Sequence, residues 1–556
     1  MFGTIELHGS KLMIKWDGEE VATTPCYNLS FLPYDRVRKE GDSVVFHQRR
    51  PQSVIGVVSA VVRGDVQVYL AHIGPACPSR LPVSVTVLPI GYRLLLWLAE
   101  DGTVDIKAGY SADPTDDVRS LLNMYRYNEE RPALPMVTGA HRYTRDGIVD
   151  ETHLDTFTID PATSKDFDDA LSVDVANRTI YVHIVDIAAA ALSEIEEQRM
   201  RERCLTLYLA NEATDHLLDE ATASHTLSLM VGEPRQTVTV KAVLNADNTI
   251  ASYEIYRSVI VVKRRYTYEE VDALLKTETD ASPALYYLKD ISEHRSAVVK
   301  YNINLPSVVF QVDPETGLAT SLETHATTTP AHQLVATAMI MANMLVSKHL
   351  HDQGVALPNR FHESLRGYDV SKAPVTGDAV VDSFILLKRY ARACYKVDER
   401  GHFGLGLEHY VHFTSPMRRY ADVLVHKMLA GYTVETAALE AEVEWINKRS
   451  YTCRVIQDLY EHWKVIGWLK RLPTCPEVII TSASKAGVQW FMPSLSLNGF
   501  THISQLAPKQ FYDFDPATQQ LKGRTTGSIF AVGGKKRATL LSVDPVMAQP
   551  LLMLSD

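Results

Sequence analysis

The apolar pattern of this 556-residue chain changes at two places, and this limits its possible folds more than any other feature. Up to about Ile106, short β-type runs alternate with Gly, Pro and Asp turns. From about residue 152 to Leu472, strand-like and helix-like runs mix, and the helices lengthen toward the end. After Pro473, short strand-like runs return. The two changes predict several domains of different kinds.

We therefore expect a multidomain α+β chain, with a mixed α/β core flanked by small β-barrel domains of the OB type. The expected parts are a small β-rich domain of cold-shock or OB type at 1–65, a second small domain with a linker at 66–150, OB-like or winged-helix, the core at 151–472, and an OB-type barrel at 473–556. Helix starts are predicted at Asp113-Pro114, Thr329-Pro330 and Ser415-Pro416, where a cap is followed by proline.

Composition narrows the class of protein further. Hydrophobic residues make up 46% and charged residues 22%, as in globular proteins. The six cysteines are scattered without zinc or redox spacing, which suits a reducing cytoplasm. The most apolar long stretch, 81–99, is interrupted by Pro89, Gly91 and Arg93, so we expect no membrane span. A net charge of −11 argues against a uniformly basic nucleic-acid binder, although a polyanion needs only a local positive channel.

Four carboxylates lie within ten residues, after a strand-like run and around a turn at Pro161: Asp160, Asp166, Asp168 and Asp169. Two unit charges about 4 Å apart repel by roughly 4 kcal/mol at an effective dielectric near 20, so converging carboxylates need a cation. Oxygen ligands without His or Cys favour Mg²⁺ or Mn²⁺ over zinc. The alternatives are a solvated acidic turn or a calcium loop, and the spacing lacks the alternation and Gly of an EF-hand.

A second run far downstream is suited to binding a phosphate. It extends from His402 to Asp422 and contains Ser415-Pro416-Met417-Arg418. A helix that starts at Ser415 would present free amide groups to a phosphate, and Arg418 adds a planar fork. For three residues in or just after this run we retain a structural interpretation. It is a surface ion pair for Arg419, and an i,i+4 contact on one helix face for Asp422 with His426.

These two runs resemble the catalytic signatures of the ribonuclease II and ribonuclease R family. The match rests on 152–155, 158–160, 165–171 and 402–422, and it covers about 152–472 and the tail. The resemblance implies that Asp160, Asp166, Asp168 and Asp169 bind Mg²⁺, with Mn²⁺ as a substitute, and activate water, while Arg418 stabilises the phosphate. It also implies that Tyr208 stacks on an RNA base and that Tyr268 contacts the RNA near its 3′ end.

The tail resembles the OB-type module that closes these enzymes, through residues 499–506. The resemblance implies RNA contacts from His502 and from a basic edge formed by Lys535, Lys536 and Arg537. Two positions depart from the family. Ala336 and Thr337 replace glutamates on one helix, and Gln457 or Asp458 lies where another glutamate is usual. The lack of a long basic tail favours ribonuclease II over ribonuclease R.

The resemblance implies a hydrolytic 3′-to-5′ exoribonuclease that degrades single-stranded RNA to nucleoside 5′-monophosphates, as a cytoplasmic monomer. The alternatives are an RNA-binding protein with an inactive nuclease core, a ribonuclease R-like enzyme that acts on structured RNA, a phosphorolytic exonuclease, and a DNase. The presence of all four aspartates and Arg418 argues against the inactive core.

Overall fold

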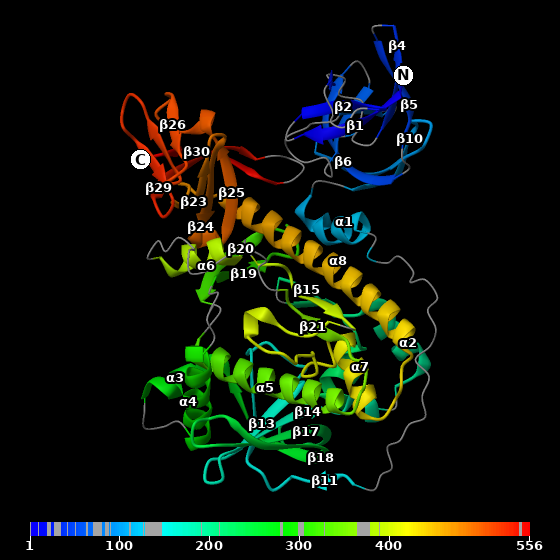
Figure 1. Cartoon of the computed structure of the whole chain (residues 1–556), viewed down its shortest axis with the longest axis vertical. Helices are drawn as coiled ribbons and strands as arrows, with labels where there is room; N and C mark the ends of the chain where they lie inside the picture. The colour runs from blue at the N-terminus through cyan, green and yellow to red at the C-terminus, as the bar shows by residue number, and fades with distance from the viewer. Residues whose placement is uncertain are drawn as a thin grey trace. The chain divides into compact units, whose positions relative to one another are not determined.

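The structure is a computed structural model. It describes residues 2–8, 11–18, 24–26, 35–41, 43–49, 52–62, 65–70, 80–83, 88, 91–110, 113–125, 127, 147–190, 192–210, 212–277, 282–298, 305–326, 329–363, 378–387, 390–397, 399–543 and 548–556. The chain divides into two compact units, and Figure 1 labels many of their elements. Unit 1 comprises Met1–Glu129, Val308–Thr324 and Asp458–Asp556, and unit 2 comprises Glu130–Ser307 and His325–Gln457.

Unit 1 begins with two five-stranded antiparallel sheets. The first has the order β3-β2-β1-β4-β5 and consists of β1 (Phe2–His8), β2 (Lys11–Trp16), β3 (Thr24–Pro25), β4 (Arg36–Glu40) and β5 (Ser43–Gln48). The second has the order β10-β9-β6-β7-β8 and consists of β6 (Gln52–Val62), β7 (Asp65–Leu70), β8 (Arg80–Val83), β9 (Arg93–Leu98) and β10 (Val104–Tyr110).

The two sheets share one hydrophobic cluster, to which Ile5, Val37, Val58 and Leu96 belong. The domain boundary expected at residue 65 falls in the hairpin between β6 and β7, which pair with each other inside the second sheet. The change from the first sheet to the second comes between β5 and β6. The linker expected at 128–150 lies mostly outside the described residues.

A short helical segment follows, as Asp113-Pro114 predicts. It consists of the 3-10 turn Pro114–Asp116 and α1 (Asp117–Met124), and the Asp113 side chain accepts the Thr115 amide. Lys464 of α8 (Thr436–Leu469) donates to Asp117 Oδ2 at 2.8 Å and to the Gly317 carbonyl at 2.6 Å. The hairpin of β19 (Pro306–Val312) and β20 (Ala319–Ala326) contains that glycine. The buried ammonium therefore joins three separate chain segments of unit 1.

The tail forms a second β region of unit 1. A five-stranded sheet has the order β25-β24-β23-β29-β30, and a three-stranded sheet has the order β26-β27-β28. Their strands are β23 (Val478–Ser484), β24 (Gly487–Met492), β25 (Leu497–His502), β26 (Tyr512–Asp515), β27 (Gln520–Gly523), β28 (Ile529–Ala531), β29 (Lys535–Val543) and β30 (Pro550–Ser555).

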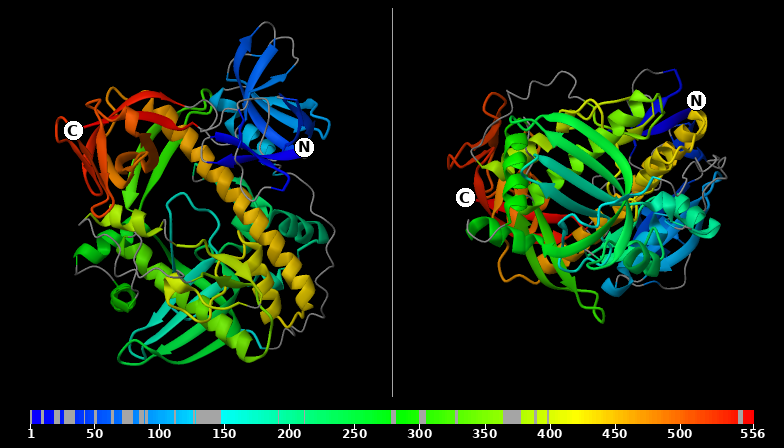
Figure 2. Two further views of the ribbon diagram at one scale, coloured as in Figure 1. Left: turned by 45° about the horizontal axis from the view of Figure 1, so that its top comes forward. Right: turned by 90° about the horizontal axis from the view of Figure 1, so that it is seen from below.

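Unit 2 is built on a six-stranded sheet of order β11-β18-β12-β13-β14-β17 that closes because β17 also pairs with β18. The first part of β18, up to Val261, pairs with β17, and Val262 and residues 264–267 pair with β12. The strands are β11 (Val149–Asp150), β12 (Thr156–Asp160), β13 (Asp169–Asp174), β14 (Thr179–Val185), β17 (Pro234–Leu244) and β18 (Ile250–Thr267). Figure 2 shows the strong curvature of this sheet.

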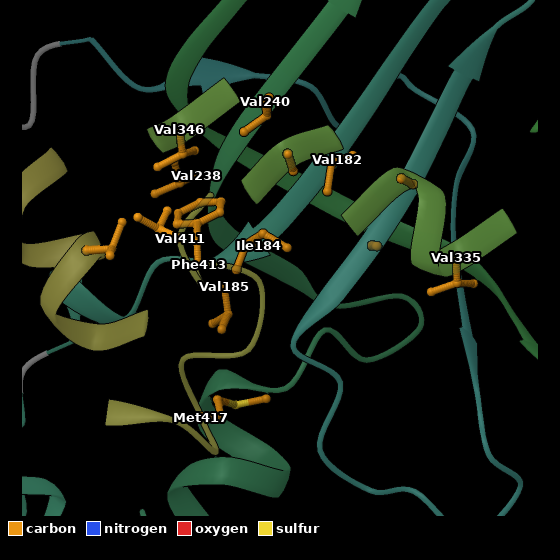
Figure 3. Packing of buried hydrophobic residues seen from close by; sticks show 14 of the residues in the cluster. Val182, Ile184, Val185, Val238, Val240, Val335, Val346, Val411, Phe413 and Met417 are labelled. Atoms are coloured by element: carbon orange, nitrogen blue, oxygen red, sulfur yellow. The ribbon is translucent and has the colours of Figure 1, made fainter. Parts of the chain in front are cut away.

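Unit 2 also contains long and short helices. They are α2 (Glu194–Arg203), the π-helix Thr222–Leu227, α3 (Tyr268–Thr277), α4 (Pro283–Val298), α5 (Pro330–Asp352), α6 (Ala379–Leu387), α7 (Tyr420–Leu429) and the first part of α8. Two short hairpins add β15 (Leu207–Leu209) with β16 (Glu212–Asp215) and β21 (Asn359–Phe361) with β22 (Cys394–Lys396). Figure 3 shows how valines of β14, β17 and α5 pack with Val411 and Phe413 in the core.

Helix α5 begins where Thr329-Pro330 predicts, because Thr329 caps it by accepting the His332 amide. The helix predicted at Ser415-Pro416 instead begins at Tyr420, so that expectation was wrong. Residues 415–419 form a turn in which the amides of Arg418 and Arg419 bond to the Ser415 carbonyl. The extended Arg419 makes a β-bridge to Leu205, and the Tyr420 amide bonds to the Cys204 carbonyl, which delays the helix.

Candidate active site

The four aspartates belong to one strand-loop-strand segment of unit 2. Strand β12 ends at Asp160, β13 starts at Asp169, and the irregular residues 161–168 connect them. The two strands are antiparallel neighbours in the closed sheet, so the loop brings its carboxylates to one end of it. The Asp168 backbone is fixed to the next strand, because its carbonyl accepts the Val185 amide.

Burial dominates the electrostatics of this segment. It raises the pKa of Asp160 to about 6 and that of Asp168 to about 7. The pKa of Asp169 is raised well above its ordinary value by burial, and the neighbouring Asp160 and Asp168 raise it further. The positive charge of Arg418 works in the opposite direction on Asp168. The site therefore holds buried negative charge that protons or a cation must compensate.

The second signature meets the acidic loop at Asp168. The Met417 amide donates a 2.8 Å hydrogen bond to Asp168 Oδ1, and Arg418 Nε lies 3.8 Å from Asp168 Oδ2. The Arg418 side chain is 45% exposed, so its guanidinium remains accessible beside the carboxylates. Its Nη2 donates to Ser415 Oγ at 3.1 Å, which orients the fork.

Buried contacts hold the turn that carries Arg418. Asp422 Oδ1 accepts the Ser415 amide at 2.8 Å, and its carboxylate pairs with Arg419 at 2.8 and 2.9 Å. His426 Nε2 lies 3.0 Å from the Phe413 carbonyl, and its ring stacks on the Phe413 ring at 4.3 Å. Arg419, Asp422 and His426 thus make structural contacts, and Asp422 pairs with Arg419 at i,i+3 spacing.

The two tyrosines interact electrostatically with the carboxylates. Burial raises the pKa of Tyr208 to about 12, with a further contribution from Asp166. Burial also raises the pKa of Tyr268, and the negative charges of Asp169 and Asp160 add to that effect. The Tyr268 ring stacks on His332 of α5, with ring centroids 3.9 Å apart and planes 4° from parallel.

The structure gives the contacts or the exposure of the residues that depart from the family's usual glutamates. Gln457 Nε2 donates a 3.0 Å hydrogen bond to the Tyr208 carbonyl, which a glutamate carboxylate would not do. On α5, Ala336 is exposed, and Thr337 is half-buried. Asn343 on the same helix accepts the Phe413 amide at 2.8 Å and so supports the second signature.

The remaining predicted site residues belong to unit 1. His502 Nδ1 accepts the Ser504 amide at the end of β25. Lys535 is exposed on β29, whereas Lys536 is buried, pairs with Asp556 and lies 4.7 Å from the Phe530 ring centroid. Arg537 Nε donates to the Asp556 carbonyl at 2.8 Å. Of the three residues of the predicted basic edge, Lys535 and Arg537 are therefore exposed, and Arg537 also bonds to Asp556.

Two residues that contact the acidic loop were not predicted from the sequence, Arg265 of β18 and the buried Ser228. Arg265 follows Lys263 and Arg264 in an unbroken basic run, and nothing in the run distinguishes it. No sequence signal marks Ser228.

The donor set suits a divalent cation. Asp160 Oδ2 is buried without a hydrogen-bond partner, and the other candidate ligands are carboxylate oxygens, which hard cations prefer. Within the part of the chain that is described, no three His, Cys, Asp or Glu side chains already stand in a ligand arrangement. The fit therefore rests on the chemistry of the carboxylates and on the unpartnered Asp160 oxygen.

Comparison with known proteins gives the family. The model of the RNB domain matches residues 148–435, and this chain belongs to the RNB domain family. Nucleases of this family are metal-dependent. Ribonuclease R of Chlamydia muridarum is 28% identical over 403 residues, which cover 64% of this chain. The chain covers 57% of that relative's length.

Solved structures show the same fold. Ribonuclease R of Mycoplasma genitalium in complex with ribose-methylated single-stranded RNA matches with a TM-score of 0.73 at 18% identity, over 100% of both chains. Yeast Ssd1, a pseudonuclease, matches with a TM-score of 0.64 at 16% identity, over 94% of this chain and 81% of Ssd1. The expected fold class, a mixed α/β core with small β domains, is confirmed.

The family resemblance inferred from the sequence is also confirmed, but these relatives give no support to its finer assignment to ribonuclease II. Among the described residues, no helix has both the length and the apolar character needed to cross a membrane.

Proposed function

We propose that this chain is a hydrolytic exoribonuclease that degrades single-stranded RNA from its 3′ end to nucleoside 5′-monophosphates. The observation that supports this most directly is the junction at Asp168, where the Met417 amide and the Arg418 guanidinium meet the acidic loop. Carboxylates that can bind a metal ion and a guanidinium that can bind a phosphate thereby share one site. Phosphodiester hydrolysis requires both.

In this proposal Asp160, Asp166, Asp168 and Asp169 hold Mg²⁺, with Mn²⁺ as a substitute. When bound, the metal supplies a water of lowered pKa and polarises the phosphate. The buried carboxylates favour such a cation because it offsets the desolvation that raises the pKa of Asp168. The exposed half of Arg418 is available to bind a non-bridging phosphate oxygen beside it.

Tyr208 and Tyr268 supply the aromatic contacts for RNA in this proposal. Both interact electrostatically with the carboxylates, Tyr208 with Asp166 and Tyr268 with Asp169, and we assign a base of the bound RNA to each ring. Stacking on an aromatic ring tolerates any base, which suits an enzyme that degrades RNA regardless of sequence. In the tail, exposed His502, Lys535 and Arg537 are candidates for further RNA contacts. We assign the activity to a monomer in the cytoplasm, in keeping with the scattered cysteines.

An inactive nuclease core is the main competing interpretation, because a pseudonuclease shares this fold. The complete set of four aspartates with Arg418 favours activity. The test is to incubate a 5′-labelled single-stranded RNA with Mg²⁺ and no inorganic phosphate. We expect progressive shortening and release of nucleoside 5′-monophosphates, which chelation stops.

Phosphorolysis, DNA cleavage and digestion of structured RNA would each give a different result in the same experiment. Nucleoside diphosphates that appear only with added phosphate would indicate phosphorolysis. Cleavage of DNA of the same sequence would indicate a general nuclease, and digestion of a duplex without a single-stranded tail would indicate action on structured RNA. Binding without any cleavage, with Mg²⁺ or with Mn²⁺, would contradict the proposal.

A further inference from the structure

The acidic loop has no regular secondary structure, so its backbone groups need partners from elsewhere in unit 2. Two side chains from outside the loop supply several of these partners. Arg265 lies on β18, next to β12 in the sheet, with Thr158 as its register partner. Ser228 follows the π-helix Thr222–Leu227.

Arg265 binds the first half of the loop. Its Nη2 donates to the carbonyls of Pro161 at 2.9 Å, Ala162 at 3.1 Å and Ser164 at 3.3 Å. Its guanidinium carbon also lies 4.8 Å from the centroid of the Phe167 ring. One half-buried cation therefore gathers three carbonyls that follow Asp160 and contacts the ring between Asp166 and Asp168.

Ser228 binds the second half. Its Oγ accepts the Phe167 amide at 3.0 Å and donates to the Lys165 carbonyl at 3.1 Å, on either side of Asp166. The Leu229 amide adds a 3.1 Å bond to the Phe167 carbonyl. Ser228 is itself held by Arg235, whose Nε donates to the Ser228 carbonyl at 3.0 Å.

We propose that Arg265 and Ser228 are positioning residues that fix the backbone of residues 161–168, so that the carboxylates of Asp160, Asp166 and Asp168 are ordered before a metal ion and RNA bind. This inference rests on the proposed function. The hydrogen bonds of both side chains to the loop are made to its backbone, and the charge of Arg265 also lowers the pKa of Asp160. Their contribution is to remove the cost of ordering the loop, which would otherwise reduce metal affinity and turnover.

The matched pair for the test is Arg265→Gln and Arg264→Gln. Both remove one positive charge from adjacent positions on β18, but Arg264 is exposed and lies over the Tyr266 ring at 4.2 Å. Loss of general attraction for RNA would affect both variants equally. Only Arg265→Gln is expected to loosen the loop. Arg265→Lys keeps the charge without the planar fork and should fall between Arg265→Gln and the parent.

Three measurements on the full chain decide the matter. Hydrogen exchange, followed by mass spectrometry, should accelerate at the amides of residues 162–168 in Arg265→Gln. Mn²⁺ alone, titrated by electron paramagnetic resonance, should bind roughly 10–100-fold more weakly, as for lost outer-shell partners of metal ligands. On RNA, kcat should fall by a similar factor while the Kd for RNA stays near that of the parent.

Ser228→Ala is an independent variant and decides the question if Arg265→Gln does not fold. It should accelerate exchange at residues 165–168 and weaken Mn²⁺ binding. Parent-like loop exchange and Mn²⁺ affinity in a folded variant, or equal effects from Arg264→Gln, would overturn the proposal. Faster exchange spread evenly over unit 2 would also overturn it, since that indicates a general structural role. If the parent itself does not cleave RNA, the proposed function fails, while the exchange comparison still tests the loop.

Discussion

The backbone amide of Met417 donates a 2.8 Å hydrogen bond to the carboxylate of Asp168, 249 residues away along the chain. This single bond joins the two sequence signatures, and Arg418 is the next residue in the same turn. The position of Arg418 relative to the acidic loop therefore depends on Asp168 as an acceptor as well as on its charge.

Asp168→Asn separates these two roles. Its amide oxygen still accepts the Met417 amide, whereas the negative charge is lost. We expect cleavage to fall by more than the roughly 10–100-fold that loss of an outer-shell partner costs, with RNA binding retained. Asp169→Asn should behave in the same way. Cleavage of labelled RNA and fluorescence anisotropy without Mg²⁺ measure the two effects.

Glu254→Gln on the exposed side of β18 removes one negative charge outside the site and serves as the control. It should leave cleavage unchanged. Near parental turnover in both Asp168→Asn and Asp169→Asn would remove the acidic loop from the mechanism.

Two adjacent lysines in the tail, Lys535 and Lys536, should differ in role. We expect the first to bind RNA and the second to stabilise the tail. Lys535 is exposed, so Lys535→Ala should weaken RNA binding and reduce the slope of log affinity against log salt by about one. Lys536 is buried against Phe530 and pairs with Asp556, so Lys536→Ala should destabilise the tail by about 1 kcal/mol and leave the salt slope unchanged. Binding titrations at several salt concentrations and thermal melting distinguish them. A reduced slope in Lys536→Ala would show that its pairing with Asp556 opens when RNA binds.

Local signals predicted the helices at Asp113 and Thr329, because a capping side chain and a proline act within one turn of their own position. The same signal failed at Ser415, where the bridge between Arg419 and Leu205 comes from a segment about 200 residues earlier. The sequence around Ser415 does not indicate that Leu205 will pair with Arg419.

The carboxylates and Arg418 were predictable because their chemistry is concentrated in short runs. The residues that hold the acidic loop could not be predicted in this way. Arg265 and Ser228 bond to backbone carbonyls and amides, which every sequence possesses. The basic run at Lys535 shows the converse. Three neighbouring positive residues appeared equivalent in the sequence, but alternation along β29 buries the middle one.

A buried histidine should make unit 2 sensitive to acid. His183 lies between Ser172 at 3.0 Å and Thr239 at 2.8 Å inside the closed sheet, and burial lowers its pKa to about 3. Because the unfolded value is near 6.5, the unfolded chain binds one more proton between pH 6.5 and 3. The stability that depends on neutral His183 is thus fully present above pH 6.5 and is lost as the pH falls.

The expected slope is about 1.4 kcal/mol per pH unit for this one group. Chemical unfolding of the parent, His183→Gln and His225→Gln at pH 7, 6 and 5 measures it. His183→Gln should lose less stability between pH 6 and 5 than the parent, while the exposed His225 makes no difference. Equal pH dependence in the parent and His183→Gln would mean that the buried imidazole is protonated without cost.

Tyr208 should determine how short an RNA the enzyme can still hold. The charges of Asp166 and Arg418 act on its hydroxyl, and its carbonyl accepts a hydrogen bond from Gln457. Base stacking on an aromatic ring contributes roughly 1–3 kcal/mol, which matters most when few other contacts remain. Tyr208→Ala should therefore digest long RNA nearly as the parent does but stop at a different limit length, whereas Tyr208→Phe keeps the ring and should stop where the parent stops. One labelled oligonucleotide, digested by all three proteins beside a melting curve for each, distinguishes binding from packing. A purely structural Tyr208 gives a lower melting temperature with the parental limit product, and that result in Tyr208→Ala would exclude the stacking role.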